Sequence, residues 1–262
     1  MCRWGSERQK ERWLGALLRG ETIGCCALAE PEAGLNTGRF LTRAEPRGKG
    51  WLLNGNKSSV LNGGVSDLAI VFAKTPGEGG REEHSAFLLE AGREGFSREA
   101  IKDKVGLRAA SLADLSFKDC PLGPEDLLGS LGAGEEIFRS AVEEGQFSSA
   151  AGSLGLAQAS LDAATEYSLE RKAFGRAIAG FQLVQDMIAR MVVDVEAARL
   201  MVYRAAVLKD SGAPAAPQVA MAKHFASGAA LRAADDALQI HGGYGYSDEY
   251  PVERFLRDAR AT

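Results

Sequence analysis

The sequence predicts an α+β protein in which an antiparallel β-domain is followed by an antiparallel bundle of α-helices. Up to about residue 130, the apolar runs are short and are separated by Gly, Asn and Pro, a pattern typical of strands and turns. From residue 131 onward, apolar residues recur at helical spacing through long stretches rich in Ala, Ser and Gly. We therefore place a β-domain at 22–130 and a helical domain at 131–262, with a short helical segment at 1–21 before them.

The β-domain begins after a predicted helix over 6–18, for which Ser6 is a suitable N-terminal cap. Glycine-containing turns are expected at 47–50 and 61–64, and 75–84, rich in Gly and Glu, is expected to be a solvated loop. The expected strands are 22–28, 39–44, 50–60, 67–74, 85–90 and 112–118.

The helical domain is predicted to hold three long helices, at 135–172, 181–209 and 218–240. A glycine-rich turn at 241–246 and a short helix starting near Pro251 should follow. The many small residues favour close antiparallel packing. Three helices leave one face of a bundle open, so a further helix or a partner subunit should cover it.

Composition narrows the classes of partner. The net charge of −4 and the pI near 5.6 argue against nucleic acid or an anionic membrane as the main partner. No segment has the roughly 20 apolar residues needed to span a bilayer, and the charged N-terminus does not resemble a secretory signal. The four cysteines form no CxxC pair, which favours free thiols in a reducing compartment such as the cytoplasm, or the mitochondrial matrix in a eukaryote.

Six groups of motifs occur in a defined order along the chain. They are AEPEAG at 29–34, NGNK at 54–57 with NGG at 62–64, KVGLR at 104–108 with LSF at 115–117, RKAFG at 171–175 with FQ at 181–182, QIHGGYGY at 239–246, and EYPVER at 249–254 with RDAR at 257–260. In this order and spacing they resemble the acyl-CoA dehydrogenase family. The resemblance covers the family's β-domain and most of its C-terminal helical domain. The N-terminal helical domain, apart from its last helix, and the final helix lie outside it.

The resemblance implies an acyl-CoA dehydrogenase-like fold and an oxidoreductase that acts on CH–CH groups. The implied reaction is the FAD-dependent α,β-dehydrogenation of an acyl-CoA thioester, with electrons passed to an electron-transfer flavoprotein. In this family a carboxylate removes the α-proton while the flavin accepts the β-hydride. The FAD site is shared between subunits, so a homo- or hetero-oligomer is expected.

The resemblance also assigns cofactor-binding residues. Arg171 is placed on the FAD pyrophosphate of a neighbouring subunit, where a guanidinium offers a fixed fork of donors. A solvated helix-end arginine is the alternative. The other implied cofactor residues are Phe174, which could instead be core, Gln182 and Gln239 on the adenine half, Gly242 and Gly243 for close backbone approach, and Leu28, Ala29 and Ser59 facing the flavin. His241 is expected to be packed or cofactor-adjacent, and no metal site is expected among the three histidines.

The chain departs from the family at the flavin. Ala29 stands where a hydroxyl residue is usual, and Ser59 stands where an aromatic residue is usual. The usual catalytic glutamate would lie beyond Thr262, and its alternative position matches Gly145, which cannot act as a base. The remaining nearby acids match neither position and are expected to be solvated charges or caps: Glu143, Glu144, Glu249 and Glu253. Two alternatives to the enzyme therefore stay open, a non-catalytic subunit that completes a partner's FAD site and a truncated gene product.

Overall fold

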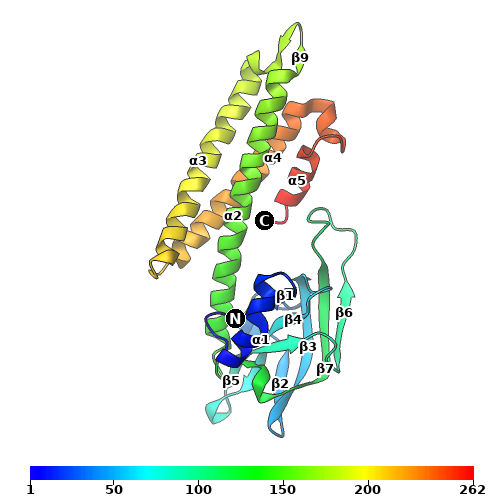
Figure 1. Cartoon of the computed structure of the whole chain (residues 1–262), viewed down its shortest axis with the longest axis vertical. Coiled ribbons are helices and arrows are strands. Elements are labelled where there is room, and N and C mark those ends of the chain that lie inside the picture. The colour runs from blue at the N-terminus through cyan, green and yellow to red at the C-terminus, as the bar shows by residue number, and fades with distance from the viewer. The chain divides into compact units, whose positions relative to one another are not determined.

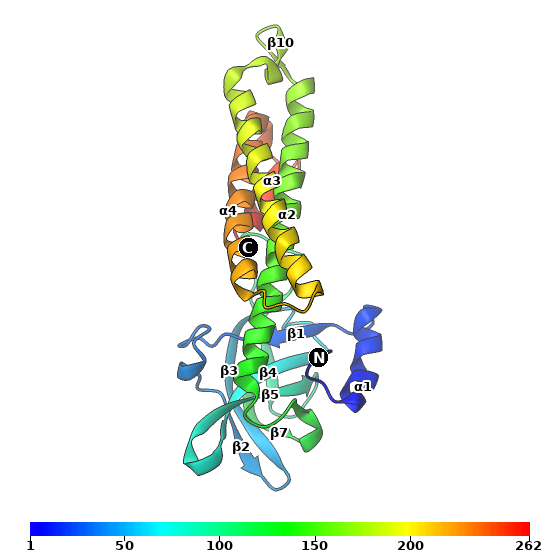
Figure 2. The ribbon, with the colours of Figure 1, turned by 90° about the vertical axis from the view of Figure 1, so that its left-hand side faces the viewer.

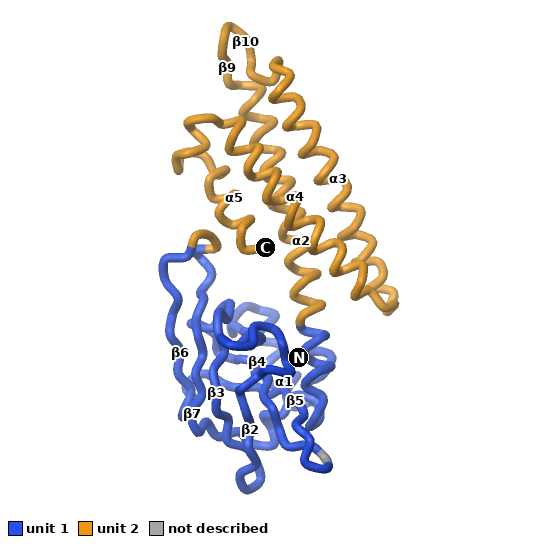
Figure 3. The backbone as a smooth tube through the Cα atoms, turned by 180° about the vertical axis from the view of Figure 1, so that it is seen from behind, with its two compact units in different colours: residues 1–104, 108–141 blue, residues 105–107, 142–262 orange. Residues whose placement is uncertain are grey.

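The computed structural model describes residues 1–77 and 79–262, and these form two compact units (Figure 3). Unit 1 consists of residues 1–104 and 108–141, and unit 2 of residues 105–107 and 142–262. The long helix α2, Gly134–Glu170, begins in unit 1 and continues into unit 2.

Unit 1 opens with helix α1, Glu7–Leu18, which confirms the predicted first helix. Ser6 caps it, because its Oγ accepts a bond of 3.3 Å from the Gln9 N–H while Gln9 Oε1 accepts one of 2.9 Å from the Ser6 N–H. Gln9 also donates to the carbonyls of Glu125 and Leu127, at 2.8 and 3.0 Å. The same side chain thus caps the helix and fastens it to the β-domain.

A single sheet dominates unit 1 (Figure 1). Its strands follow the order β6-β7-β3-β2-β4-β5-β8, with β1 paired to β4. They are β1 Gly24–Ala27, β2 Arg43–Arg47, β3 Gly50–Leu61, β4 Leu68–Pro76, β5 Glu82–Glu90, β6 Phe96–Ala100, β7 Leu112–Leu122 and β8 Leu127–Leu128. Most neighbouring pairs are antiparallel, as predicted, but β1 and β2 each pair with β4 in parallel.

Three sequence predictions for the sheet need correction. The strand expected at 39–44 starts at Arg43, because Thr37–Arg39 forms a 3-10 turn. The loop expected at 75–84 is shorter, since β4 runs to Pro76 and β5 starts at Glu82. Buried Thr75 and Ser85 are joined by a 2.9 Å hydrogen bond between their hydroxyl groups, which extends the pairing. The prediction also missed β6, whose Phe96 stacks on Phe117 with ring centroids 5.5 Å apart.

The start of α2 packs on the core of unit 1 through Phe138. Its ring meets Phe40 and Phe72 edge to face, with centroids 5.8 and 5.2 Å apart. Such contacts add roughly 0.5–1.5 kcal/mol each to the area that the rings bury. The first turns of α2 are thereby part of the β-domain core.

Unit 2 is a helical bundle in which α2, α3 Gln182–Asp210 and α4 Ala216–His241 run side by side (Figure 2). The three predicted long helices are confirmed, with ends shifted by one or two residues. Alanine dominates the buried positions, and it lets backbones approach closely. The buried alanines of these helices include Ala150, Ala157, Ala164, Ala198, Ala205, Ala222, Ala226, Ala230, Ala233 and Ala237.

The connections of unit 2 include one hairpin that the sequence did not predict, as well as the predicted turn and short helix. Strands β9 Lys172–Ala173 and β10 Arg176–Ala177 form a hairpin after α2. The predicted glycine-rich turn is a 3-10 helix, Gly242–Tyr246, and α5, Val252–Ala259, starts directly after Pro251. Within the described part of the chain, no helix combines the length and the apolar character needed to cross a membrane.

We expect Asp126→Ala to destabilise the protein by about 2–3 kcal/mol, because it leaves a half-buried arginine without its partner. Asp126 is only 5% exposed and holds both Arg93 nitrogens, at 2.7 and 2.9 Å, as well as the Gly123 N–H at 2.7 Å. Urea unfolding measures the change. Glu135→Ala is the control, since its 3.3 Å bond to Arg139 is exposed and its loss should cost less than about 0.5 kcal/mol. Equal losses of stability in the two variants would contradict the stabilising role of the Asp126–Arg93 pair.

Candidate functional site

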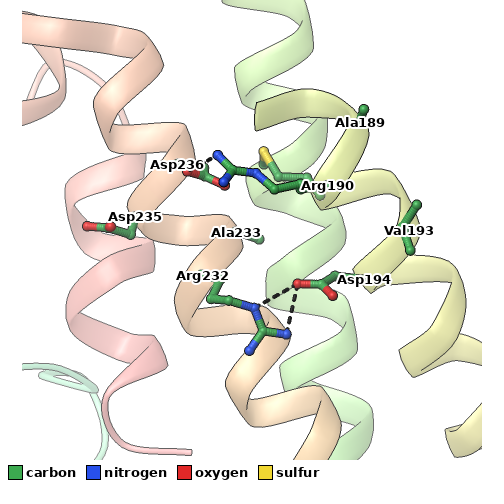
Figure 4. A pocket seen from close by; sticks show the side chains of 9 residues that line it. Ala189, Arg190, Val193, Asp194, Arg232, Ala233, Asp235 and Asp236 are labelled. Carbon is green, nitrogen blue, oxygen red and sulfur yellow. Dashed lines mark hydrogen bonds and ion pairs between the residues drawn. The ribbon is translucent and has the colours of Figure 1, made fainter. Parts of the chain in front are cut away.

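A hollow of about 590 Å³ lies between α3 and α4, and it contains none of the residues predicted to bind a cofactor (Figure 4). Its two arginines each form an ion pair with one of its aspartates. Arg232 lies 2.8 Å from Asp194, and Arg190 lies 3.6 Å from Asp236. Burial raises the pKa of Asp236, against the effect of Arg190. Both arginines are engaged by carboxylates, so we do not take this hollow as the candidate site.

A second hollow, of about 550 Å³, brings three predicted residues together, namely Arg171, Gly242 and Gly243. It forms within unit 2, where the end of α2 meets the turn after α4. Its other lining residues are Tyr167, Ile178, Ile240, His241, Tyr244, Ser247 and Glu249. Residues separated by about 70 positions in the chain thus share one surface, and we take this hollow as the candidate site.

The backbone fixes Arg171 at the edge of this hollow. Its N–H donates to the Tyr167 carbonyl at 2.9 Å, and its own carbonyl accepts the Ile178 N–H at 2.8 Å. Arg171 therefore closes α2 and opens the hairpin at once. Its guanidinium lies 5.6 Å from the centre of the Tyr244 ring. Among the described residues no carboxylate forms an ion pair with it, which leaves its fork of donors available to an anion.

The two glycines play different parts in the backbone. Gly242 ends α4 with φ 59° and ψ −131°, a conformation that side-chain-bearing residues rarely adopt. Gly243 has no such strain, but nothing lies within 4 Å of the position that its Cβ would occupy. The chain at Gly243 is thus exposed to the hollow, and a ligand can approach the backbone there.

His241 lies at the base of the hollow and is only 3% exposed. Its Nδ1 is 2.8 Å from the Ala237 carbonyl, and since a carbonyl can only accept, Nδ1 carries the proton. Its ring stacks on Tyr167, with centroids 4.1 Å apart. Burial lowers the pKa of His241, so the imidazole is neutral near pH 7. The expectation of a packed histidine is confirmed, and this one supports the turn that carries the two glycines.

Three predicted residues of unit 2 do not line the hollow. Phe174 is at the tip of the β9–β10 hairpin with φ 51° and is 96% exposed, so the alternative that it belongs to the core is wrong. Gln182 begins α3 and Gln239 lies in the last turn of α4, and both are exposed. Their roles toward a cofactor stay predictions.

The flavin-facing residues predicted in unit 1 are Leu28, Ala29 and Ser59. The Ala29 carbonyl accepts the Ser58 N–H at 2.9 Å, which holds the chain after β1 against β3. Ser59 has φ 53° at an irregularity in the pairing of β3 with β7, and its N–H donates to Asp114 at 2.8 Å. The structure therefore brings these two segments together. The sequence analysis missed Asp114, because no local pattern predicts the irregular pairing of β3 with β7 at which it accepts the Ser59 N–H.

A buried ion pair connects these two segments. Lys57 Nζ lies 2.9 Å from Glu30 Oε1, and the two side chains are 0% and 3% exposed. Burial lowers the pKa of Lys57 to about 8, although its bond to Glu30 opposes the shift. Burial raises the pKa of Glu30, but bonds from Thr42, Leu41 and Lys57 outweigh it and leave the pKa below its usual value. Contacts with protein groups therefore stabilise both charges.

Three of the four acidic residues expected to be solvated charges or caps form ion pairs. Glu143 and Glu144 lie 3.3 and 2.8 Å from Lys209, and Glu253 pairs with Arg257, which confirms their assignment as helix charges. Glu249 differs, because it lines the hollow. The described residues contain no group of three or more His, Cys, Asp or Glu side chains that could hold a metal ion.

Two family models match the chain. The acyl-CoA dehydrogenase middle domain matches residues 25–120, and the acyl-CoA dehydrogenase C-terminal domain matches residues 132–262. The chain is 40% identical to the short-chain-specific acyl-CoA dehydrogenase of Clostridium acetobutylicum, over 98% of this chain and 68% of that protein. It is 41% identical to the mitochondrial short-chain-specific enzyme of Rattus norvegicus, over 100% of this chain and 64% of that protein.

Solved structures agree with the sequence relatives. The butyryl-CoA dehydrogenase of Megasphaera elsdenii superposes with a TM-score of 0.94 at 39% identity, over 99% of this chain and 68% of that one. A chain from a structure titled for the electron transferring flavoprotein of Acidaminococcus fermentans also gives 0.94, at 42% identity over 98% and 68% of the two chains.

The chain spans about two thirds of the length of these relatives, 64% of the rat protein and 68% of the clostridial one. They are FAD-dependent flavoproteins of fatty acid metabolism and oxidoreductases that act on CH–CH groups. Two family domains, identity near 40% throughout and the predicted fold all agree, and the chain therefore belongs to the acyl-CoA dehydrogenase family.

Proposed function

We propose that this chain takes part in the FAD-dependent α,β-dehydrogenation of an acyl-CoA thioester. One observation carries the proposal: the hollow of unit 2 combines the unpaired guanidinium of Arg171 with the open backbone of Gly243. A fork of cationic donors beside a backbone that lacks a side chain suits a dinucleotide diphosphate. Membership of a family of FAD-dependent flavoproteins supports the same ligand.

The residues of the hollow fit FAD on chemical grounds. Arg171 would hold the diphosphate, and the turn at Gly242–Gly243 would let phosphate or ribose approach the main chain. Neutral His241 adds no charge of its own but keeps the turn in place through Ala237 and Tyr167. When bound, FAD supplies the acceptor for the hydride from the β-carbon.

In unit 1, the backbone at Ala29 and Ser59 would orient the flavin ring. Ala29 lacks the hydroxyl group and Ser59 lacks the aromatic ring that are usual at their positions in the family, so main-chain N–H and C=O groups would carry more of the binding. We assign no carboxylate of this chain as the catalytic base. Glu143, Glu144 and Glu253 are engaged in ion pairs.

We further propose an oligomer in which Arg171 of one subunit completes the FAD site of another. Exposed apolar side chains on α3 support this, since Val193, Leu200 and Val207 recur every seven residues and form one stripe. We propose an electron-transfer flavoprotein as the electron acceptor, which the Acidaminococcus structure supports. Free cysteines and the mitochondrial relative support a reducing compartment, the cytoplasm or the mitochondrial matrix.

A second function is a non-catalytic subunit that completes the FAD site of a related partner. The observation that favours it is the contrast between the units. The hollow of unit 2 keeps its cationic fork, whereas Ala29 and Ser59 offer the flavin little side-chain contact. Purified protein that carries FAD by itself supports the enzyme, and colourless protein that gains FAD only with a related chain supports the partner role.

Arg171→Ala should lower the affinity for FAD about 10-fold to 100-fold, because it removes a charge-assisted pair of bonds to the diphosphate. Titration of the purified chain with FAD, followed by flavin fluorescence, measures the change. Arg139→Ala is the matched control, since Arg139 is an exposed arginine in the first turns of α2 and forms an exposed ion pair with Glu135. Equal affinities of the Arg171→Ala protein and the parent would remove the diphosphate assignment.

Substitutions at the two glycines should separate binding from stability. Gly243→Ala should leave unfolding unchanged within about 0.5 kcal/mol but lower FAD affinity about 10-fold, since its methyl group would occupy the space that the ligand needs. Gly242→Ala should instead cost about 1–3 kcal/mol of stability, because of its φ of 59°. Thermal unfolding and FAD titration of both variants test this, and unchanged FAD binding by Gly243→Ala would argue against backbone approach there.

A further inference from the structure

The two segments proposed to orient the flavin share a buried charge pair. Glu30 directly follows Ala29, and Lys57 stands two residues before Ser59. Their side chains meet at 2.9 Å with exposed fractions of 3% and 0%. Burying two charges is costly unless contacts compensate, and replacing such a pair with apolar groups is often neutral for stability. The presence of the pair at this point therefore calls for a reason other than stability.

Glu30 is the centre of the segment that follows β1. Its carboxylate accepts the Leu41 N–H at 2.6 Å and the Thr42 N–H at 3.3 Å. Its backbone closes the turn that follows, because Glu30 N–H donates to the Gly34 carbonyl at 3.1 Å and Gly34 N–H donates back to the Glu30 carbonyl at 2.8 Å. Glu30 thus holds the first turn of this stretch through its backbone and the other end, at residues 41 and 42, through its carboxylate.

Lys57 joins that stretch to the sheet. It belongs to β3, so its backbone is held by the strand, while its ammonium reaches Glu30 and lies 3.8 Å from the centre of the Phe40 ring. The ring is fully buried and packs on Phe138, so the ammonium cannot shift without disturbing the core. The next residue, Ser58, donates its N–H to the Ala29 carbonyl.

We propose that Lys57 and Glu30 are positioning residues for the flavin. Their ion pair holds the main chain at Ala29 in register with the main chain at Ser58 and Ser59, so that backbone groups of both segments meet the flavin ring in a fixed arrangement. Lys57 acts through Glu30 and does not touch the cofactor itself. The inference rests on the proposed function, because it takes these two segments to face the flavin.

The double variant Glu30→Gln/Lys57→Met tests the role. It removes both charges together, keeps the side-chain lengths, and leaves a carbonyl oxygen for the Leu41 and Thr42 N–H groups. The variant loses the ion pair between the segment and the strand, together with the contact of the ammonium with the Phe40 ring. The matched control is Asp126→Asn/Arg93→Met, which neutralises another largely buried pair of unit 1 with contacts of 2.7 and 2.9 Å. The single variant Glu30→Gln serves if the double variant does not fold.

The full chain of each variant is titrated with FAD, its bound-flavin absorption spectrum is recorded, and the amide hydrogen exchange of Ser58 is measured without FAD. The first double variant should bind FAD about 10-fold more weakly, the scale of losing a group that orients a binding residue. It should also shift the shape of the visible flavin band and exchange the Ser58 amide faster. The control pair should match the parent in all three measurements.

Unchanged affinity and spectrum in the first double variant would overturn the positioning role. So would losses that scale with stability alike in both double variants. A parent protein that binds no FAD, alone or with a related chain, would overturn the proposed function and the flavin role with it. That failure is distinct, because Ser58 exchange would still report whether the pair holds the two segments together.

Discussion

Close approach of helix backbones is the constraint on which the helical half of this protein depends. An alanine core gives each buried side chain little apolar area, so the bundle gains stability by bringing main chains near one another rather than by filling space with large residues. The same approach brings the end of α2 beside the turn after α4. Arg171 and Gly243 can therefore share a hollow, although about 70 residues separate them in the chain.

Unit 1 differs from unit 2, because buried polar groups hold its segments in place. Glu30 and Lys57 tie one segment to the sheet, and Asp126 with Arg93 ties another. Apolar contacts are non-directional, whereas a carboxylate that accepts bonds from two backbone N–H groups and one ammonium fixes direction as well as distance. Where the chain must present its main chain to a ligand, direction is the property that matters.

The sequence predicted the elements whose signals are local. Ser6 with Gln9, the glycine of each turn and the small residues of the long helices all act within a few positions, so helix ends differ from the prediction by only one or two residues. Long-range pairing was harder to foresee. Short β6 depends on the stacking of Phe96 and Phe117, and Asp114 caps Ser59 from another strand. Motif resemblance pointed to Arg171, Gly242 and Gly243, but it could not show that Glu249 lines the same hollow or that Phe174 is fully outside it.

The unusual residues Ala29 and Ser59 have a physical consequence for flavin binding. Ser59 offers no ring to stack on a ligand, and Ala29 offers no hydroxyl, so main-chain groups must supply more of the binding there. Main-chain groups contribute only where the chain is held still, because ordering a mobile segment costs about 1–2 kcal/mol per residue. The buried pair beneath Ala29 and Ser58 removes that cost in advance. A flavin-binding surface with few side-chain contacts therefore depends more on Glu30 and Lys57 than one with a full set would.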